Sequence, residues 1–512
     1  MFRYLRVTIL VAESSTVPPQ MREVSSIARD GRTYSLAQVI NRAAGLALLP
    51  LYTHLLHPDE FGVYTLVIST LDLLAVLSGL GLTTAMNRFY LEFPDDAPMR
   101  RQVVGTAVCL VGGLAAVLLL LCWPLGVLVS HALFGNDARV AMGASAVAAV
   151  AMIALFELIC AYAVVRRSVR HYLWLSCAKA AALLAANGVM VGLLHGGALA
   201  AVASTAVAIG AVVAIALPLM LRSTGLQFRR GLARQMFRYG MPLVPSALAA
   251  AASGVIERYY LNSAAGAAAV GIYSLAHRLS SLLQMFIAAP FSQTYTVRRM
   301  ESLVRGTDQG VYNRILLLFV LLMSLCSLAL SVFAVDLVAL LAPGSYGDAA
   351  QLVPLLGLCV VLGAINFNLE TGIHFTKRTW ALPVIAAVTL LVSMPLNAML
   401  AHRHGAIGTA MALLLVQALR LVLTFFANAS LGSTDIRLDW PRALSIMGAT
   451  LAVALAAVAV EAPPLHPAWL AMKSVLVLAV AGLLLASPMV GAAVRDDLRS
   501  MWQRRQVQGG AE

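Results

Sequence analysis

Charged residues are scarce in this chain of 512 residues: Asp, Glu, Lys and Arg make up 12% of it, whereas hydrophobic residues make up 60%. Soluble proteins average about 25% charged residues, so a soluble fold could not keep this much apolar surface away from water. The apolar residues also occur in runs of roughly 20, the length with which a helix crosses a hydrocarbon core of about 30 Å. We therefore predict an all-α polytopic membrane protein.

Acidic residues are fewer than basic ones, 23 against 36, and the net charge is +13. In a soluble protein such an excess would suggest a nucleic-acid partner. In a membrane protein it has a simpler cause, because lysine and arginine collect in the cytosolic loops. We expect no nucleic acid to bind this chain.

The sequence has no Cys-x-x-Cys pair, and we expect no signal peptide at its start. Its six cysteines all fall inside apolar runs with no Cys-x-x-Cys pair, which predicts small buried side chains and neither disulfides nor metal ligands. The apolar stretch within residues 1–33 is too short for a signal peptide, and no small-residue cleavage site follows it. We predict a cytosolic tail there, and translation could start at Met1 or at Met21.

Fourteen apolar segments could span a membrane, and basic residues alternate between the loops that join them. One set of loops holds most of the arginines, whereas the other set holds only Arg139 and Arg403. This asymmetry predicts that both termini are cytoplasmic. The predicted spans are 34–56, 60–88, 102–130, 138–164, 171–194, 197–221, 239–262, 267–295, 314–341, 350–376, 379–401, 405–429, 442–461 and 467–492.

The loops on the far side of the membrane are short and leave no room for an extracytoplasmic catalytic domain. The longest internal cytosolic segment, 222–238, is basic and amphipathic, and we expect it to lie along the membrane surface. The predicted organisation is an N-terminal tail (1–33), an N-lobe of six spans (34–221), this connector (222–238), a C-lobe of six spans (239–429), two further spans (430–492) and a cytosolic C-terminal tail (493–512).

A short phrase occurs twice in the chain, at a separation of 209 residues. EFGVYTL at 60–66 and AVGIYSL at 269–275 share glycine, tyrosine and leucine in register, and HGGALAAVA and HGAIGTAMA repeat at the same offset. Each match lies at the far-side end of a helix pair. We interpret spans 1–6 and 7–12 as parallel repeats, the arrangement that surrounds a central site in some transporters.

Several stretches resemble the polysaccharide-biosynthesis flippases of the Wzx type, within the MATE-like multidrug/oligosaccharidyl-lipid/polysaccharide exporter superfamily. They are LPLYTHLLHPDEFGVYTLVISTLDLLAVLSGLGLTTAMNRFY, IERYYLNSAAGAAAVGIYSLAHRLSSLL, PFSQTY and PLNAMLAHRHGAIGTAMA. The resemblance implies two six-helix lobes around a central cavity and transport of an undecaprenyl-diphosphate-linked oligosaccharide from the cytosolic to the periplasmic leaflet of the bacterial inner membrane. It also implies membrane lipids, a polysaccharide polymerase and chain-length machinery as partners.

Transport of such a cargo makes no bond, but it needs cations that face an internal cavity, because ionised groups in hydrocarbon must line water or meet a partner. Arginine suits a diphosphate through its forked donors. The candidate substrate-binding residues are Arg42, Arg258, Arg278, Lys179 and Arg420. Arg278 is the strongest, since it lies near the centre of its span. Arg42 could instead snorkel to the interface, and Arg258 could form an ion pair with another helix.

Asp72 near the centre of span two and Glu257 beside Arg258 are the candidates for coupling transport to Na⁺ or H⁺. A buried carboxylate in this position would either take up a cation or form a salt bridge, here to Arg42 or Arg278. We expect interfacial roles for Glu157 and Glu370. Two further charged residues have no polar stripe beside them and receive no role: Asp336 and Lys473.

The repeats do not share their charges. At the offset of 209, Arg278 aligns with Ser69 and Arg258 with Leu49.

Three functions are alternatives to the oligosaccharide flippase. The first is a drug or cation antiporter on the same fold, which predicts a smaller, more acidic or aromatic cavity. The others are a flippase for the peptidoglycan precursor and a membrane polymerase or ligase. The last needs a large periplasmic loop. We expect no enzyme activity, no resident cofactor and no metal.

Overall fold

The computed structural model describes residues 19–79, 81–93, 96–305, 309–376, 378, 380–430, 438–460 and 463–487. All regular structure within these ranges is helical, which confirms the predicted all-α class. A helix forms its backbone hydrogen bonds within itself, and this is what allows a chain to cross hydrocarbon. Ten of the described helical segments are long and apolar enough to do so. The chain is therefore a multi-pass membrane protein.

Two long helices are each divided by a glycine with a non-helical backbone. Helix α11 (Val244–Leu283) contains Gly266 at φ 81°, and α16 (Ala381–Ser430) contains Gly405 at φ 55°. Both glycines lie where the sequence predicts the boundary between two spans. The full number of fourteen spans stays a prediction.

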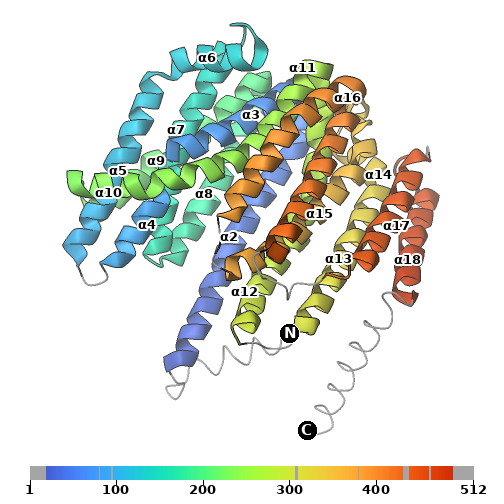
Figure 1. Cartoon of the computed structure of the whole chain (residues 1–512). Coiled ribbons are helices and arrows are strands. Elements are labelled where there is room, and N and C mark those ends of the chain that lie inside the picture. The colour runs from blue at the N-terminus through green and yellow to red at the C-terminus, as the bar shows by residue number, and fades with distance from the viewer. Residues whose placement is uncertain are drawn as a thin grey trace. The chain divides into compact units, whose positions relative to one another are not determined.

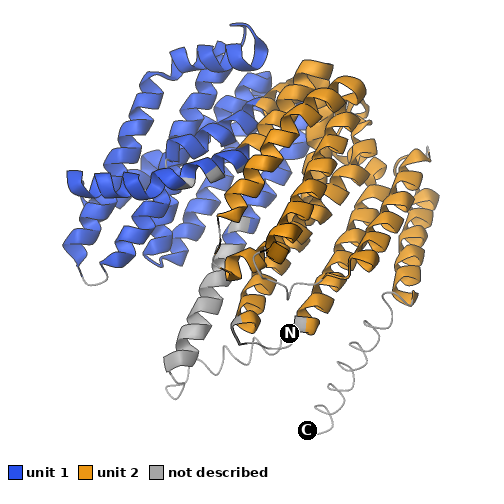
Figure 2. Cartoon of the chain, viewed as in Figure 1, with its two compact units in different colours: residues 1–55, 67–251 blue, residues 56–66, 252–512 orange. Residues whose placement is uncertain are grey.

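Contacts divide the chain into two compact units, and Figure 2 colours each of them: unit 1 comprises residues 1–55 and 67–251, and unit 2 comprises 56–66 and 252–512. The predicted connector therefore belongs wholly to unit 1, and the two C-terminal spans belong to unit 2. The predicted lobe boundary lay in the connector, whereas the contacts change units within α11.

The helices of unit 1 start with α2 (Pro19–Leu55), which begins well before the predicted limit of the first span at residue 34. The others are most of α3 (Pro58–Gly79), α4 (Leu82–Glu92), α5 (Ala97–Leu120), α6 (Cys122–Phe134), α7 (Val140–Val165), α8 (Val169–Asn187) with a π-helical extension (Gly188–Leu193), α9 (Gly197–Thr224) and α10 (Arg230–Gly240) (Figure 1).

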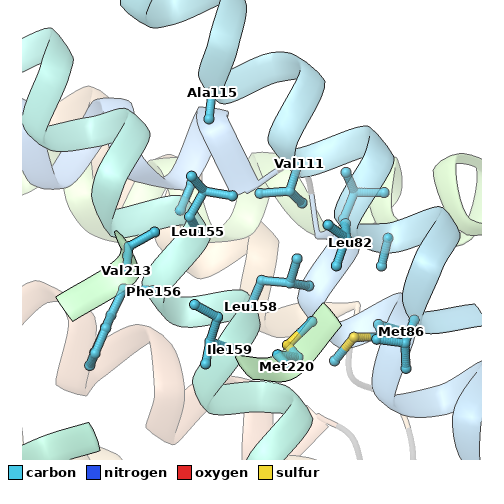
Figure 3. Close-up of a cluster of buried hydrophobic side chains, with 14 of the residues drawn as sticks. Leu82, Met86, Val111, Ala115, Leu155, Phe156, Leu158, Ile159, Val213 and Met220 are labelled. Atoms are coloured by element: carbon cyan, nitrogen blue, oxygen red, sulfur yellow. The ribbon is translucent and has the colours of Figure 1, made fainter. Parts of the chain in front are cut away.

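Helix α7 lies at the centre of unit 1 and packs against α5, α6 and α9. Its leucine, isoleucine and phenylalanine side chains meet those of α4, α5 and α9 in one buried cluster, which includes Leu82, Val111, Leu155 and Val213 (Figure 3). Between spanning helices such contacts act through close van der Waals packing, because lipid tails are as apolar as the side chains.

The basic connector forms the short helix α10, which packs against α4 and α5 of unit 1. Leu232, Ala233 and Met236 are buried on one side, whereas Arg234 and Arg238 are exposed on the other. This confirms the amphipathic pattern. The helix begins only at Arg230, because α9 continues to Thr224 and an irregular segment follows it.

The helices of unit 2 are the start of α3, most of α11, a π-helical turn (Gln284–Ala288), α12 (Ala289–Arg305), α13 (Gln309–Val332), α14 (Ala334–Leu341), α15 (Ala349–Phe375), α16, α17 (Trp440–Ala459) and α18 (Pro467–Ala486). Helix α15 is central here and packs against α12, α13, α16 and α17.

An ion pair attaches the last helix to unit 2. Lys473 Nζ of α18 lies 2.5 Å from Asp336 Oδ2 of α14, and the backbone N–H of Leu465 donates to Asp336 Oδ1 at 2.8 Å. Both charged side chains are buried. Neither residue had an expected role from its sequence pattern, and in the structure each compensates the charge of the other.

The duplicated phrases contact each other inside unit 2. A Cβ on Gly62 would lie 1.8 Å from the carbonyl oxygen of Ala267, and one on Gly271 would lie 2.1 Å from that of Pro58. At the offset of 209, Pro58 is equivalent to Ala267 and Gly62 to Gly271. Each of the two contacts therefore joins one residue to the equivalent of the other, as happens between residues related by a two-fold axis. Ser274 Oγ also donates to Thr65 Oγ1, its own repeat equivalent, at 3.0 Å. The contact supports the repeat and explains why both copies carry glycine.

We expect Gly62→Ala and Gly271→Ala each to lower the thermal stability of the purified protein in detergent. The added methyl group meets a rigid backbone oxygen, and overpacking of this kind costs about 1–3 kcal/mol. Gly112→Ala in α5 is the matched control, because nothing lies within 4 Å of its Cβ position. Equal unfolding temperatures for the three variants would contradict the close contact.

We expect Lys473→Met to destabilise the protein by about 3–5 kcal/mol, because it leaves the carboxylate of Asp336 buried without its cation. The double variant Asp336→Asn/Lys473→Met should recover most of this loss, since neither charge remains. Thermal unfolding and proteolysis of the C-terminal helices measure both effects. A double variant no more stable than the single one would show that the ion pair does not govern the attachment of α18.

Candidate functional site

The two strongest cationic candidates lie on the two limbs of α11, before and after the break at Gly266. Arg258 belongs to the first limb and Arg278 to the second, and both side chains are half-buried. His277 lies within electrostatic range of both guanidinium groups. The hairpin in α11 therefore brings together two arginines that are 20 positions apart in the sequence.

Both arginines keep buried donors that have no partner within the described part of the chain. These are the Nε of Arg258 and the Nη1 of Arg278. Arg258 Nη1 donates to the carbonyl oxygen of Gly254, one turn earlier in its own helix, at 2.9 Å. A buried N–H without an acceptor is costly, so these donors suit an anionic ligand.

Glu257 places a carboxyl group beside the arginines. It is 5% exposed, and its Oε2 accepts a hydrogen bond from the hydroxyl of Tyr273 at 2.9 Å. The Tyr273 ring in turn lies 6.0 Å from the ring of His277. Sequence reasoning missed the bond between Tyr273 and Glu257, because no spacing rule connects residues across a hairpin.

Arg420 is paired with a carboxylate, although its Nε, like those donors on α11, is buried without a partner among the described residues. Its Nη2 lies 3.0 Å from Glu370 Oε1 on α15, and the same oxygen accepts from Asn366 Nδ2 at 2.8 Å. The sequence assigned Glu370 an interfacial role, whereas the structure shows it in an ion pair with Arg420. Much of the positive charge of Arg420 is thereby compensated, which weakens it as a binding residue.

The remaining candidates belong to unit 1. Arg42 of α2 and Asp72 of α3 are exposed on its surface, so the expectation that Asp72 is buried is wrong. Lys179 of α8 is half-buried, with its Nζ 5.1 Å from the centre of the Phe156 ring. Lys179 and Asp72 are the charges within electrostatic range of Glu157. Unit 1 therefore has a mixed charged cluster, whereas the α11 cluster of unit 2 is predominantly basic.

Glycine shapes the segment around Gly405, and of the cysteines only Cys359 is fully buried, whereas the other five are partly buried. Gly408 lies against the carbonyl oxygen of Leu400, and Asn397 is buried and bonded to Ser393, so this segment forms a tight hairpin around Gly405. All six cysteines are free. Within the residues that the structure describes, no group of three or more His, Cys, Asp or Glu side chains could hold a metal ion.

The fold is similar to those of several solved transporters. The lipid II flippase MurJ, in an inward closed conformation, matches with a TM-score of 0.72 at 10% identity, over 88% of this chain and 97% of that one. An inward-facing multidrug resistance MATE transporter of the MOP superfamily matches with a TM-score of 0.62 at 14% identity, over 77% and 96%. A MOP superfamily transporter from Pyrococcus furiosus matches with a TM-score of 0.54 at 12% identity, over 79% and 95%.

At these identities the similarity establishes the fold, not the cargo. The chain has no significant sequence match among curated proteins. A family model described as "Polysaccharide biosynthesis protein" matches residues 27–295, slightly more than half of the sequence and including Arg258 and Arg278. The chain therefore belongs to the polysaccharide biosynthesis protein family, with a fold of the MATE and MurJ type.

Proposed function

We propose that this protein carries an undecaprenyl-diphosphate-linked oligosaccharide from the cytosolic to the periplasmic leaflet, for the synthesis of a surface polysaccharide. The observation that carries the proposal is the pair of arginines on α11, whose buried donors Arg258 Nε and Arg278 Nη1 have no acceptor among the described residues. Membership of the polysaccharide biosynthesis family supports the same class of cargo.

The chemistry of a diphosphate explains why two arginines are needed. Its negative charges cannot enter hydrocarbon unless cations and hydrogen-bond donors replace their water. Guanidinium groups do both at once, because they stay protonated and present several N–H donors in a fixed plane. His277, within electrostatic range of both, adds a polar ring, and the carboxyl group of Glu257 lies within electrostatic range of Arg258.

Movement across the membrane requires alternating access and no bond making. The structural relatives are named as transporters or flippases, which supports a non-enzymatic role. We place the protein in the bacterial inner membrane with both termini in the cytoplasm, from the distribution of arginine over the loops. A polysaccharide polymerase and chain-length machinery are the protein partners that this role implies.

We assign coupling to an ion gradient to Asp72 and Glu257. Asp72 is exposed and lies within electrostatic range of Glu157, so binding of Na⁺ or H⁺ would relieve repulsion between two carboxylates. Glu257 is buried beside the arginines and would transmit a change of charge directly to the bound cargo. The two carboxylates thus have different parts in the same cycle.

A flippase for the peptidoglycan precursor makes the same demands, and its fold is shared with this chain. A cation or drug antiporter is the other alternative, and the carboxylates of Asp72 and Glu157 in unit 1 would suit a cationic cargo. The unpaired donors of Arg258 and Arg278 favour an anionic cargo instead. Binding of lipid-linked sugars with different glycans separates the first alternative from the proposed function, and binding of organic cations tests the second.

We expect Arg258→Ala and Arg278→Ala each to weaken the binding of undecaprenyl diphosphate to the purified protein by about 10- to 100-fold, the value of hydrogen bonds to a charged group. Native mass spectrometry measures the affinity. Export of surface polysaccharide should fail in cells that carry Arg278→Ala as the only copy, while the protein stays in the membrane.

Arg139→Ala is the control for both measurements, since this arginine lies in a far-side loop. Arg420→Gln should have a smaller effect than Arg278→Ala, because Arg420 is already paired with Glu370. Unchanged binding by both α11 variants would remove these arginines from the site, and tight binding of an organic cation in place of the diphosphate would favour the antiporter.

We expect Asp72→Asn to abolish the dependence of transport on a Na⁺ or H⁺ gradient and to leave the binding of undecaprenyl diphosphate unchanged. Glu257→Gln should alter both, because it removes a charge next to Arg258. Transport into proteoliposomes, with and without each gradient, measures the coupling. If Asp72→Asn transport still responds fully to the gradient, Asp72 is not a coupling residue.

A further inference from the structure

Unit 1 contains a cavity of about 660 Å³ that the transport site does not use. It lies between the end of α7, the start of α8 and the second half of α9. Most of its lining is apolar, from Ile159 of α7, Trp174 and Ala178 of α8, and Ile215 and Leu219 of α9. Its volume lies in the range of pockets that hold a ligand, about 300–1,000 Å³.

The polar lining residues cluster around the turn between α7 and α8. Arg166 stacks on the Tyr162 ring at 5.5 Å from its centre, and its Nη1 donates to the Tyr162 hydroxyl at 3.2 Å. His171 lines the same end and contacts Ser168. The exposed side chains of Arg167 and Arg170 adjoin it. The described lining has no acidic residue, and Arg166 gives the mouth a positive charge.

The depth of the cavity corresponds to one leaflet of a membrane. Its lining on α9 runs from Ala211 to Ser223. Twelve residues of helix extend about 18 Å at 1.5 Å per residue, and half of a hydrocarbon core of about 30 Å is roughly 15 Å. The charged mouth thus lies at about the level of the lipid headgroups. Trp174, which is 74% exposed, lies near this level, where tryptophan is enriched in membrane proteins.

We propose that this cavity is a binding site for an anionic phospholipid. The acyl chain would occupy the apolar part between α8 and α9, and the phosphate would meet Arg166 and His171 at the mouth. A lipid that merely covers the outside of a spanning helix needs neither a concave surface nor a cluster of basic groups at one end. The two features together select a negatively charged headgroup over a zwitterionic one.

The site is separate from the arginines of α11, so it can be tested without any transport assay. The full-length protein is placed in nanodiscs of phosphatidylcholine that contain increasing fractions of phosphatidylglycerol with brominated acyl chains. Bromine quenches nearby tryptophan, and the difference between the wild type and Trp174→Phe isolates the signal of Trp174. Brominated phosphatidylcholine serves as the comparison lipid.

We expect brominated phosphatidylglycerol to reach half-maximal quenching at a mole fraction about fivefold lower than brominated phosphatidylcholine, the effect of one basic residue near an anionic surface. Arg166→Ala should remove most of this preference. Ala178→Leu, which fills the cavity, should reduce quenching by both lipids. Arg230→Ala in α10, outside the cavity, should change neither, and size-exclusion profiles check that each variant is folded.

Equal quenching by the two lipids would overturn the proposal, because it would mean that ordinary membrane lipid covers Trp174. Unlabelled undecaprenyl phosphate is the second competitor. If it relieves the quenching at a lower mole fraction than unlabelled phosphatidylglycerol does, the cavity belongs to the lipid carrier and the assignment to a phospholipid is wrong. Retained preference in Arg166→Ala would exclude Arg166 as the headgroup contact.

Discussion

Every charge placed among the spanning helices must find compensation, because hydrocarbon offers none. Most of this structure satisfies the constraint pairwise: Asp336 with Lys473, Glu370 with Arg420, and Glu257 with the hydroxyl of Tyr273. The first two pairs also join different helices, and the third joins the two limbs of α11, so the same contacts compensate charge and hold helical segments together. The cluster on α11 departs from this pattern: Arg258 Nε and Arg278 Nη1 are buried without an acceptor among the described residues, whereas Arg420, whose Nε also lacks one, has its Nη2 paired with Glu370. That departure is the reason to connect this cluster with an anionic ligand.

The duplication of the chain supplies the scaffold on which this departure is built. Pro58 and Gly62 contact residues of the second copy with exchanged partners, and Thr65 contacts its own equivalent Ser274, so the symmetry of the sequence is preserved as a symmetry of contacts. Backbones can approach this closely only where no Cβ intervenes. The charged residues do not follow the symmetry, because the positions that carry arginine in α11 carry Ser69 and Leu49 in the first copy. The glycines are repeated where the helices cross, whereas the charged residues differ between the copies at the site where we propose that the cargo binds.

Basic residues have two distinct environments in the protein. At the turn between α7 and α8 the arginines are exposed and close an apolar cavity, a combination suited to a lipid that stays in its leaflet. On α11 the arginines are half-buried and adjoin a histidine and a carboxylate, a combination suited to a phosphate group that must leave water. Arginine therefore suits either kind of ligand, and the burial of its side chain and the residues around it determine which kind it binds.

The sequence by itself determined the class of the protein, the approximate limits of most spans, the repeat and the amphipathic connector, and it drew attention to the arginines of α11, because periodicity, length and charge are local properties of the chain. It could not determine which charges meet. Asp336 and Lys473 were given no role, Glu370 was placed at an interface, and Asp72 was expected to be buried, yet the first three form ion pairs and the last is exposed. The cavity beside Arg166 also had no signal in the sequence. A pairing or a cavity depends on how helices from distant parts of the chain are packed together, and only the tertiary structure decides that.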